Sequence, residues 1–241
     1  MRIKLLKFLK RNPSNDYGKK FTSFKDAKRF SANGGIYFDK RFTKFEGPKN
    51  VDLVDRFYVA SILPSLLNIK KISILDMGGG PNPIYSYIKK STNVSTKCYV
   101  LDTPKLVKIL KHKVPKQFRS DVRYITHLSE IKLKKLDIVY FNSSMQYLEN
   151  YQGLIKKISR FKPSYILIGY TPMHSSNKNY YSVQYGVPGS EHPIIFFSLK
   201  KLKKLMNNLK YKNIYENKYN NIIKNSDFNN CYYADLLFKK F

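Results

Sequence analysis

The sequence is poor in cysteine and in long apolar runs. Its two cysteines, Cys98 and Cys231, have no CxxC pattern and no neighbouring histidines, so we expect reduced thiols, no disulfide framework and no metal site. No stretch approaches the roughly 18 uncharged apolar residues that span a bilayer. Lysines interrupt residues 1–10 too often for a signal peptide. These absences predict a soluble, cytoplasmic protein.

Acidic residues are scarce, 16 against 45 lysines and arginines, so the formal net charge is +29. Such a charge suits an anionic partner, for example RNA, phospholipid headgroups or a phosphorylated substrate. Lysine, asparagine, isoleucine and tyrosine are all abundant, as an AT-rich genome would encode without selection for a partner. Residues 1–10 alternate lysine with apolar residues, which predicts either a helix resting on an anionic membrane surface, peripheral to it, or a helix that packs on the domain.

The length of 241 residues fits one α/β domain with additions. We expect a basic helical extension over residues 1–50 and the main domain over residues 51–241. In the extension, Ser23 can cap a helix over residues 24–30, which Gly34-Gly35 would end. A second helix is expected over residues 51–68.

From residue 72 onward, β-type apolar runs alternate with helical patterns, as in a parallel sheet with crossover helices. The expected strands are residues 72–77, 97–102, 122–126, 137–142 and 165–170, and the tail predicts two more over residues 213–219 and 231–238. The expected helices are residues 103–111, 151–161 and 199–209. The pattern indicates an α/β fold.

Residues 171–197 are rich in Tyr, Ser, Asn, Pro and Gly, and Pro188-Gly189 marks a turn. Loops of this length usually carry function. The segment follows the fifth strand, at the carboxyl edge where open α/β folds bind ligands. It therefore predicts a substrate lid.

The first strand ends in an acid and three glycines over residues 76–80, a turn whose backbone N–H groups can approach a ligand closely. Asp102 ends the second strand 22 residues after Gly80, where a carboxylate accepts hydrogen bonds from ribose hydroxyls. A dinucleotide site would have a third glycine, whereas Pro81, Asn82 and Pro83 follow here and leave few N–H donors for a pyrophosphate. The acid before the glycines favours a cofactor that carries an ammonium group.

At this corner the chain resembles the class I S-adenosylmethionine-dependent methyltransferases. It resembles more closely the methyltransferases associated with bacterial surface-polysaccharide gene clusters. The likeness extends over residues 72–241 and departs from the general pattern at Asn82, where a third glycine is common. It is carried by Ile74-Leu75-Asp76-Met77-Gly78-Gly79-Gly80, Asn142-Ser143-Ser144-Met145-Gln146-Tyr147-Leu148, Tyr170-Thr171-Pro172, Val183-Gln184, His192-Pro193, Phe196-Phe197-Ser198, Ser23-Phe24-Lys25-Asp26-Ala27 and Gly34-Gly35-Ile36-Tyr37.

The resemblance implies S-adenosylmethionine as the cofactor and a three-layer Rossmann-like methyltransferase fold, with a mostly parallel sheet and an antiparallel last strand. It assigns contacts with the methionine end, the ribose and the transferred methyl group to Asp76, Gly78, Gly79, Gly80, Asp102, Asn142 and Ser143. Candidates for the adenine contact are Thr126, His127 and Ser129, each of which could instead be a turn residue.

Methyl transfer from a sulfonium is a direct displacement, so the protein mainly aligns the reactants and excludes water. An oxygen acceptor benefits from a base, and the candidates are His174 and His192 in the predicted lid. Gln146, Tyr147 and Gln184 could bind a hydroxyl-rich substrate. Packing or capping roles stay open for all five residues.

The leading interpretation is a methyltransferase that acts at an oxygen of a saccharide or another small acceptor in surface-glycan synthesis. One alternative is an RNA methyltransferase, favoured by the charge. The fourth strand, however, ends in Asn142-Ser143-Ser144-Met145 and lacks the Asn/Asp-Pro-Pro-aromatic motif used on base amines. Another alternative is a non-catalytic binding protein that retains the fold.

Overall fold

The computed structural model describes residues 16–31, 44–49, 60, 63–64, 68–185, 191–219, 223, 228 and 230–241. The strands are β1 (Asp16–Tyr17), β2 (Lys71–Met77), β3 (Ser95–Leu101), β4 (Val122–Ile125), β5 (Ile138–Asn142), β6 (Tyr165–His174), β7 (Tyr180–Tyr185), β8 (Glu191–Ser198), β9 (Tyr211–Tyr219) and β10 (Cys231–Lys240). The helices are α2 (Phe24–Phe30), α4 (Ile84–Ser91), α5 (Pro104–Leu110), α6 (Tyr151–Ser159) and α7 (Leu199–Asn208), with short 3-10 turns η2 (Lys116–Phe118), η3 (Leu128–Glu130) and η4 (Met145–Tyr147).

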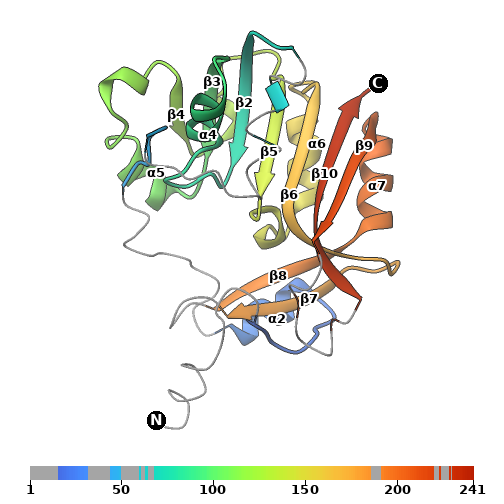
Figure 1. Ribbon diagram of the computed structural model, residues 1–241. Helices are drawn as coiled ribbons and strands as arrows, with labels where there is room; N and C mark the ends of the chain where they lie inside the picture. The colour runs from blue at the N-terminus through green and yellow to red at the C-terminus, as the bar shows by residue number, and fades with distance from the viewer. Residues whose placement is uncertain are drawn as a thin grey trace, which may run out of the picture.

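The main sheet has the strand order β4-β3-β2-β5-β6-β10-β9. The five strands from β4 to β6 are mutually parallel, and β10 runs antiparallel to both β6 and β9. The predicted fold class, a Rossmann-like arrangement with an antiparallel last strand, is thus confirmed. Figure 1 shows the carboxyl ends of β2 and β5 pointing toward a second layer made of α2, β7 and β8.

The register of the parallel strands brings their carboxyl ends level. Met77 lies opposite Leu101 on one side and Phe141 on the other, and Leu101 lies opposite Ile125. The residues that directly follow β2 and β3 and the last residue of β5 therefore meet at one edge of the sheet. This register gathers the glycine turn, Asp102 and the end of β5.

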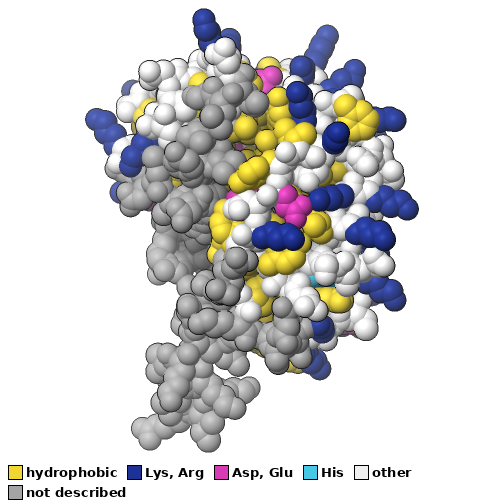
Figure 2. All heavy atoms as spheres, turned by 45° about the vertical axis from the view of Figure 1, so that its right-hand side comes forward, with side chains coloured by type: hydrophobic (Ala, Val, Ile, Leu, Met, Phe, Trp, Pro, Cys, Tyr) yellow, Lys and Arg dark blue, Asp and Glu magenta, His cyan; other side chains and the backbone are white. Residues whose placement is uncertain are grey.

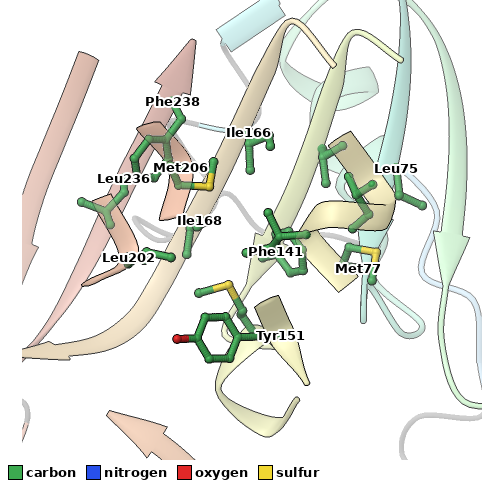
Figure 3. Close-up of a cluster of buried hydrophobic side chains, with 14 of the residues drawn as sticks. Leu75, Met77, Phe141, Tyr151, Ile166, Ile168, Leu202, Met206, Leu236 and Phe238 are labelled. Atoms are coloured by element: carbon green, nitrogen blue, oxygen red, sulfur yellow. The ribbon is translucent and has the colours of Figure 1, made fainter. Parts of the chain in front are cut away.

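Both faces of the sheet are covered by helices, because side chains alternate along each strand. Leu75 and Met77 point into a cluster with α6 and α7, whereas Ile72 and Ile74 point into a cluster with α4 and α5. Figure 3 shows the first cluster, in which residues of β2, β5, β6 and β10 meet residues of the two helices. Burial of these apolar side chains holds the main sheet and the helices on its two faces together.

Most of the predicted helices are confirmed within two residues at each end. The expected N-caps are also present, since Ser23 accepts a hydrogen bond from the Asp26 N–H at 3.1 Å and Ser198 accepts one from the Lys201 N–H at 3.3 Å. Helix α4 was not among the expected elements. Of the helix expected over residues 51–68, only residues 60, 63 and 64 are described as helical. The predictions for residues 1–10 and for Gly34-Gly35 lie outside the described residues.

Residues 171–197 are not the irregular segment that their composition suggests. Strand β6 continues to His174, where it pairs with β8, and β7 and β8 form an antiparallel pair. The expected turn at Pro188-Gly189 lies outside the described residues. Strand β1 pairs with β7, and α2 packs against β7 and β8, so part of the N-terminal extension completes this second layer. The role of the segment as a lid stays a prediction.

Both cysteines are free, Cys98 being buried and Cys231 half-buried. Among the residues that the structure describes, no group of three or more metal-binding side chains occurs. Within the same residues, no helix is both long enough and apolar enough to cross a membrane.

Candidate functional site

The glycine turn after β2 has backbone angles that residues other than glycine rarely adopt. Gly78 and Gly80 have φ angles of +73° and +54°, in the left-handed region. The Gly78 N–H donates to the Leu101 carbonyl at 2.8 Å, and the Tyr124 hydroxyl donates to the Gly80 carbonyl at 2.7 Å. These bonds fix the turn against β3 and β4. A Cβ built on Gly80 meets no atom within 4 Å, so the space beside this residue is open.

Asp76 lies inside the turn, with 1% of its surface exposed. Its Oδ2 accepts a hydrogen bond from the Ile84 N–H at 2.8 Å, which ties the carboxylate to the start of α4. A Cβ built on Gly79 would lie 2.3 Å from Oδ2, so the chain can wrap this carboxylate only with glycine there. Burial raises the pKa of Asp76 to about 7. Asp76 thus supports the glycine turn and the start of α4, and its contact with the methionine end of the cofactor stays a prediction.

Asp102 links β3 to the glycine turn. Its Oδ2 accepts a hydrogen bond from the Gly80 N–H at 3.1 Å, and its Oδ1 accepts one from the Thr103 N–H at 2.7 Å. Burial raises the pKa of this carboxyl group, while the two N–H donors oppose the shift. The structure thus brings Asp102 and Gly80 together, as their spacing predicts.

The end of β5 faces the same turn. A Cβ built on Gly78 would lie 2.8 Å from the Ser144 Cβ, so the two segments touch. Ser143 has a φ of +48°, and its hydroxyl accepts a hydrogen bond from Gln146 Nε2 at 2.9 Å. Three buried oxygens here, Asn142 Oδ1, Ser144 Oγ and Gln146 Oε1, have no partner within the described residues. Buried polar atoms are usually hydrogen-bonded, so these oxygens are acceptors that a donating ligand could satisfy.

The three candidates for the adenine contact lie after β4, where Glu130 organises the turn. Its Oε1 accepts hydrogen bonds from the N–H and hydroxyl of Thr126, at 2.8 and 3.0 Å, and from the His127 N–H at 3.0 Å. These bonds lower the pKa of Glu130. Ser129 and His127 are exposed.

Three of the predicted substrate and catalytic residues come together between η4 and the β7–β8 pair. The Tyr147 hydroxyl donates to Gln184 Oε1 at 2.6 Å, and the ring of Tyr147 lies 5.8 Å from that of His192. Gln184 and His192 are paired across the two strands. Tyr147 is 39% exposed, whereas His192 is 6% exposed and Gln146 is 1% exposed. Gln146 is therefore buried beside the end of β5, where it contacts Ser143, and is not grouped with the other three.

His174 occupies a different environment at the junction of β6 and β8. It is fully buried, its Nε2 donates to the Phe196 carbonyl at 3.1 Å, and its Nδ1 accepts from the Ser176 N–H at 3.1 Å. The ring also stacks on Tyr180 at 4.1 Å. Burial lowers the pKa of His174. Both ring nitrogens are in use, so these contacts are structural, and of the two histidines His192 remains the candidate base.

Comparison with known proteins agrees with this arrangement at the level of the fold. No family model and no curated protein matches the sequence. A methyltransferase from Methanosarcina mazei, described as S-adenosylmethionine-dependent, superposes with a TM-score of 0.53 over 79% of this chain and 99% of its own, at 12% identity. The chain has the fold of S-adenosylmethionine-dependent methyltransferases.

Two further solved structures share this fold, and they are described as having different activities. The 1,6-didemethyltoxoflavin-N1-methyltransferase of Burkholderia thailandensis, solved with its substrate and S-adenosylhomocysteine, gives a TM-score of 0.52 over 77% of this chain and 78% of its own, at 14% identity. The cyclase SpnF also gives 0.52, over 76% and 82%, at 11% identity. Because a protein described as a cyclase shares the fold, the reaction must be argued from the site.

The sequence analysis missed two polar residues of this methyltransferase-like edge. Tyr124 holds the glycine turn through the Gly80 carbonyl, yet on a predicted strand it resembles any core tyrosine. Asn82 departs from the general motif in the sequence, and in the fold its Oδ1 is buried and has no partner within the described residues. The sequence around Tyr124 and Asn82 does not identify either residue, because their surroundings are formed by chain segments that come together only on folding.

Proposed function

We propose that this protein binds S-adenosylmethionine at the glycine turn and transfers its methyl group to an oxygen of a saccharide or another small acceptor in surface-glycan synthesis. The methyltransferase fold and the resemblance of residues 74–80 to the first methyltransferase motif support the cofactor. The saccharide and surface-glycan parts rest on the sequence resemblance carried by residues 142–148 and His192-Pro193.

One observation carries the proposal for the cofactor: the left-handed glycine turn contacts Asp102 through Gly80 and the end of β5 through Gly78, where buried oxygens have no partner within the described residues. These oxygens are acceptors, and S-adenosylmethionine offers matching donors in its ammonium group and ribose hydroxyls. The residues present therefore fit this cofactor. When bound, it supplies an electrophilic methyl group on a positively charged sulfur.

The residues of the edge have separate tasks in this proposal. Asp102 accepts hydrogen bonds from the ribose hydroxyls, since a carboxylate has about four acceptor positions and two of them receive the Gly80 and Thr103 N–H groups. Asn142 and Ser143 hold the methionine part. Asp76 acts beneath them by fixing the turn to the start of α4.

The acceptor would lie beside Tyr147, Gln184 and His192, which face one another across η4 and the β7–β8 pair. Tyr147 and Gln184 form a hydrogen-bonded pair that can orient a hydroxyl-bearing molecule. His192 takes the proton from the acceptor hydroxyl at a ring nitrogen as the oxygen attacks.

Calorimetric titration of the purified full chain with S-adenosylhomocysteine tests the cofactor. We expect binding that weakens at least tenfold in Asp102→Asn. The matched control is Asp26→Asn, which removes a charge at the exposed first turn of α2 and should change the affinity less than twofold. A folded wild-type protein that does not bind, or two variants that lose affinity equally, would overturn the assignment.

Methyl transfer to a panel of saccharide acceptors tests the catalytic assignment. His192→Gln should lower turnover at least a hundredfold while S-adenosylhomocysteine still binds, because the general base alone is lost. His174→Gln is the matched comparison and should mainly reduce stability. Cofactor binding without turnover on any acceptor would favour the non-catalytic alternative.

A further inference from the structure

A groove separates α6 and α7 on the face of the sheet opposite α4 and α5. Its volume is about 520 Å³. It is lined by Gln152, Lys156, Lys201, Lys204, Leu205, Asn208 and Leu209. The groove contains none of the residues assigned above to the cofactor or to the acceptor, so it is a separate feature of the molecule.

The three lysines of the groove lack counter-charges. All three are exposed, and no carboxylate of the described residues forms an ion pair with Lys156, Lys201 or Lys204. Lys203, which directly precedes Lys204 on α7 and does not line the groove, does pair with Glu216, at 2.7 Å. The sequence from position 151 to 215 holds one acidic residue against eleven lysines and arginines. The groove is thus positive because residues 151–215 contain almost no acidic side chains. The neighbouring Lys203, by contrast, is neutralised by Glu216.

The clustering of lysines destabilises helix α7. Lys201 and Lys204, which both line the groove, stand three residues apart on α7, a spacing at which side chains are neighbours and like charges repel. No acidic residue occurs within α6 or α7 to offset the repulsion. An anion in the groove would remove this repulsion by placing negative charge among the ammonium groups.

The lining also specifies the chemistry of the anion. Gln152 and Asn208 carry amides that can both donate to and accept from hydroxyl groups, and Leu205 and Leu209 form an apolar wall. Within the described part of the chain no aromatic side chain lines the groove, so these residues offer bases no stacking surface. A concave site between two helices also fits a narrow chain better than a flat bilayer.

We propose that the α6–α7 groove binds a linear, phosphate-rich polymer without bases, such as a polyphosphate or a polyol phosphate. The three lysines neutralise successive phosphates, and the two amides contact hydroxyl groups where the polymer has them. The proposal does not depend on the methyltransferase assignment, because it uses no residue of the cofactor edge.

The test uses inorganic polyphosphate of defined length, labelled at one end, and the full chain. Fluorescence anisotropy gives the dissociation constant over a series of sodium chloride concentrations. The groove variant combines Lys156→Gln, Lys201→Gln and Lys204→Gln. The matched control combines Lys108→Gln, Lys111→Gln and Lys116→Gln, three exposed lysines in and after α5 on the opposite side of the sheet. A cooperative thermal unfolding transition at or above the midpoint of the wild type would show that each variant is folded, because removal of lysines relieves repulsion.

We expect the groove variant to bind at least tenfold more weakly than the wild type and the control to stay within twofold. The slope of log affinity against log salt should also decrease by about 2 in the groove variant alone, at about 0.7 for each lost phosphate contact. Equal losses in both variants would show that net charge alone attracts the polymer and would overturn the proposal. So would groove-dependent binding of a single-stranded RNA that is tighter than that of polyphosphate.

Discussion

Asp76 shows how a residue at the candidate site can serve the fold first. Its carboxylate lies under Gly79 and accepts a hydrogen bond from the first N–H of α4. Desolvation raises its pKa to about 7, and the negative charge of Asp102 acts in the same direction. The glycine turn therefore rests on a group that is partly protonated near neutral pH.

This environment predicts a specific pH dependence of stability. The folded protein retains a proton on Asp76 up to about pH 7, whereas the unfolded chain releases it near the ordinary pKa of 3.8. The contribution of Asp76 to the free energy of unfolding is thus greatest below about pH 4 and falls as the pH rises toward 7. The side chain at position 76 cannot titrate in Asp76→Asn. The free energy of unfolding of this variant, relative to that of the wild type, should therefore rise as the pH increases from about 4 to 7.

Urea unfolding of both proteins at several pH values measures the effect. Asp102 and Asp235, whose pKa values are also raised by burial, are present in both proteins, so the difference reports Asp76. A difference that does not change with pH would contradict the prediction.

Gly79→Ala tests the close approach of the turn to this carboxylate. The added Cβ would lie 2.3 Å from Oδ2, which the Ile84 N–H holds in place, so the backbone must move. We expect the free energy of unfolding to fall by about 1–3 kcal/mol. Gly47→Ala is the control, since its Cβ would meet Phe118 at 3.4 Å, and it should stay within about 0.5 kcal/mol. Equal effects in urea unfolding would argue against the packing described.

At the scale of elements, a bulge between β6 and β10 directs the chain from the main sheet into the second layer. The register shifts between Ala234 and Leu236, and opposite the shift Tyr170 has a φ of +44°. Asp235 lies opposite the two bulged residues of β6 and accepts hydrogen bonds from the Tyr170 N–H at 2.7 Å and the Tyr219 hydroxyl at 2.5 Å. Beyond this point β6 pairs with β8.

Asp235→Ala should destabilise the protein by about 3 kcal/mol, because a buried N–H and a hydroxyl lose their acceptor. Tyr219→Phe removes one of these bonds without leaving a buried donor unpaired and should reduce the free energy of unfolding by about 1 kcal/mol. Chemical denaturation compares the two variants with the wild type. A smaller loss in Asp235→Ala than in Tyr219→Phe would show that the bulge does not depend on the carboxylate.

At the scale of the whole molecule, the net charge of +29 is the dominant electrostatic property. Lys and Arg side chains project around the outline of the face in Figure 2, where acidic side chains are few. Repulsion among like charges disfavours the compact state relative to the expanded chain. The high net charge therefore lowers the free energy of unfolding in dilute buffer.

Added salt should raise the thermal unfolding midpoint of this protein, because screening shortens the range of repulsion from about 30 Å at 0.01 M to about 10 Å at 0.1 M. Differential scanning calorimetry in sodium chloride measures the shift. Sucrose at equal osmolality is the control for a general effect of solutes on surface burial. A midpoint that is constant or falls with sodium chloride would contradict the prediction.

The elements that the sequence missed have identifiable physical causes. Helix α4 begins after Pro83, which has no side chain able to cap it, and its first N–H is satisfied by Asp76 of the preceding strand. Strand β8 contains Pro193 within an apolar run, and proline argues against a strand. Pairing with β7 makes β8 a strand, and this contact cannot be read from β8 alone.

By itself, the sequence determined the α/β class, most strand and helix positions and the glycine turn with Asp102, because these follow from local periodicity and from the backbone freedom of glycine. Only the tertiary structure decided what each polar side chain contacts. His174 and His192 look alike in the sequence, yet one has both ring nitrogens engaged by the Phe196 carbonyl and Ser176, and the other lies beside Tyr147. Their roles differ because hydrogen-bond partners come from segments that meet only after folding.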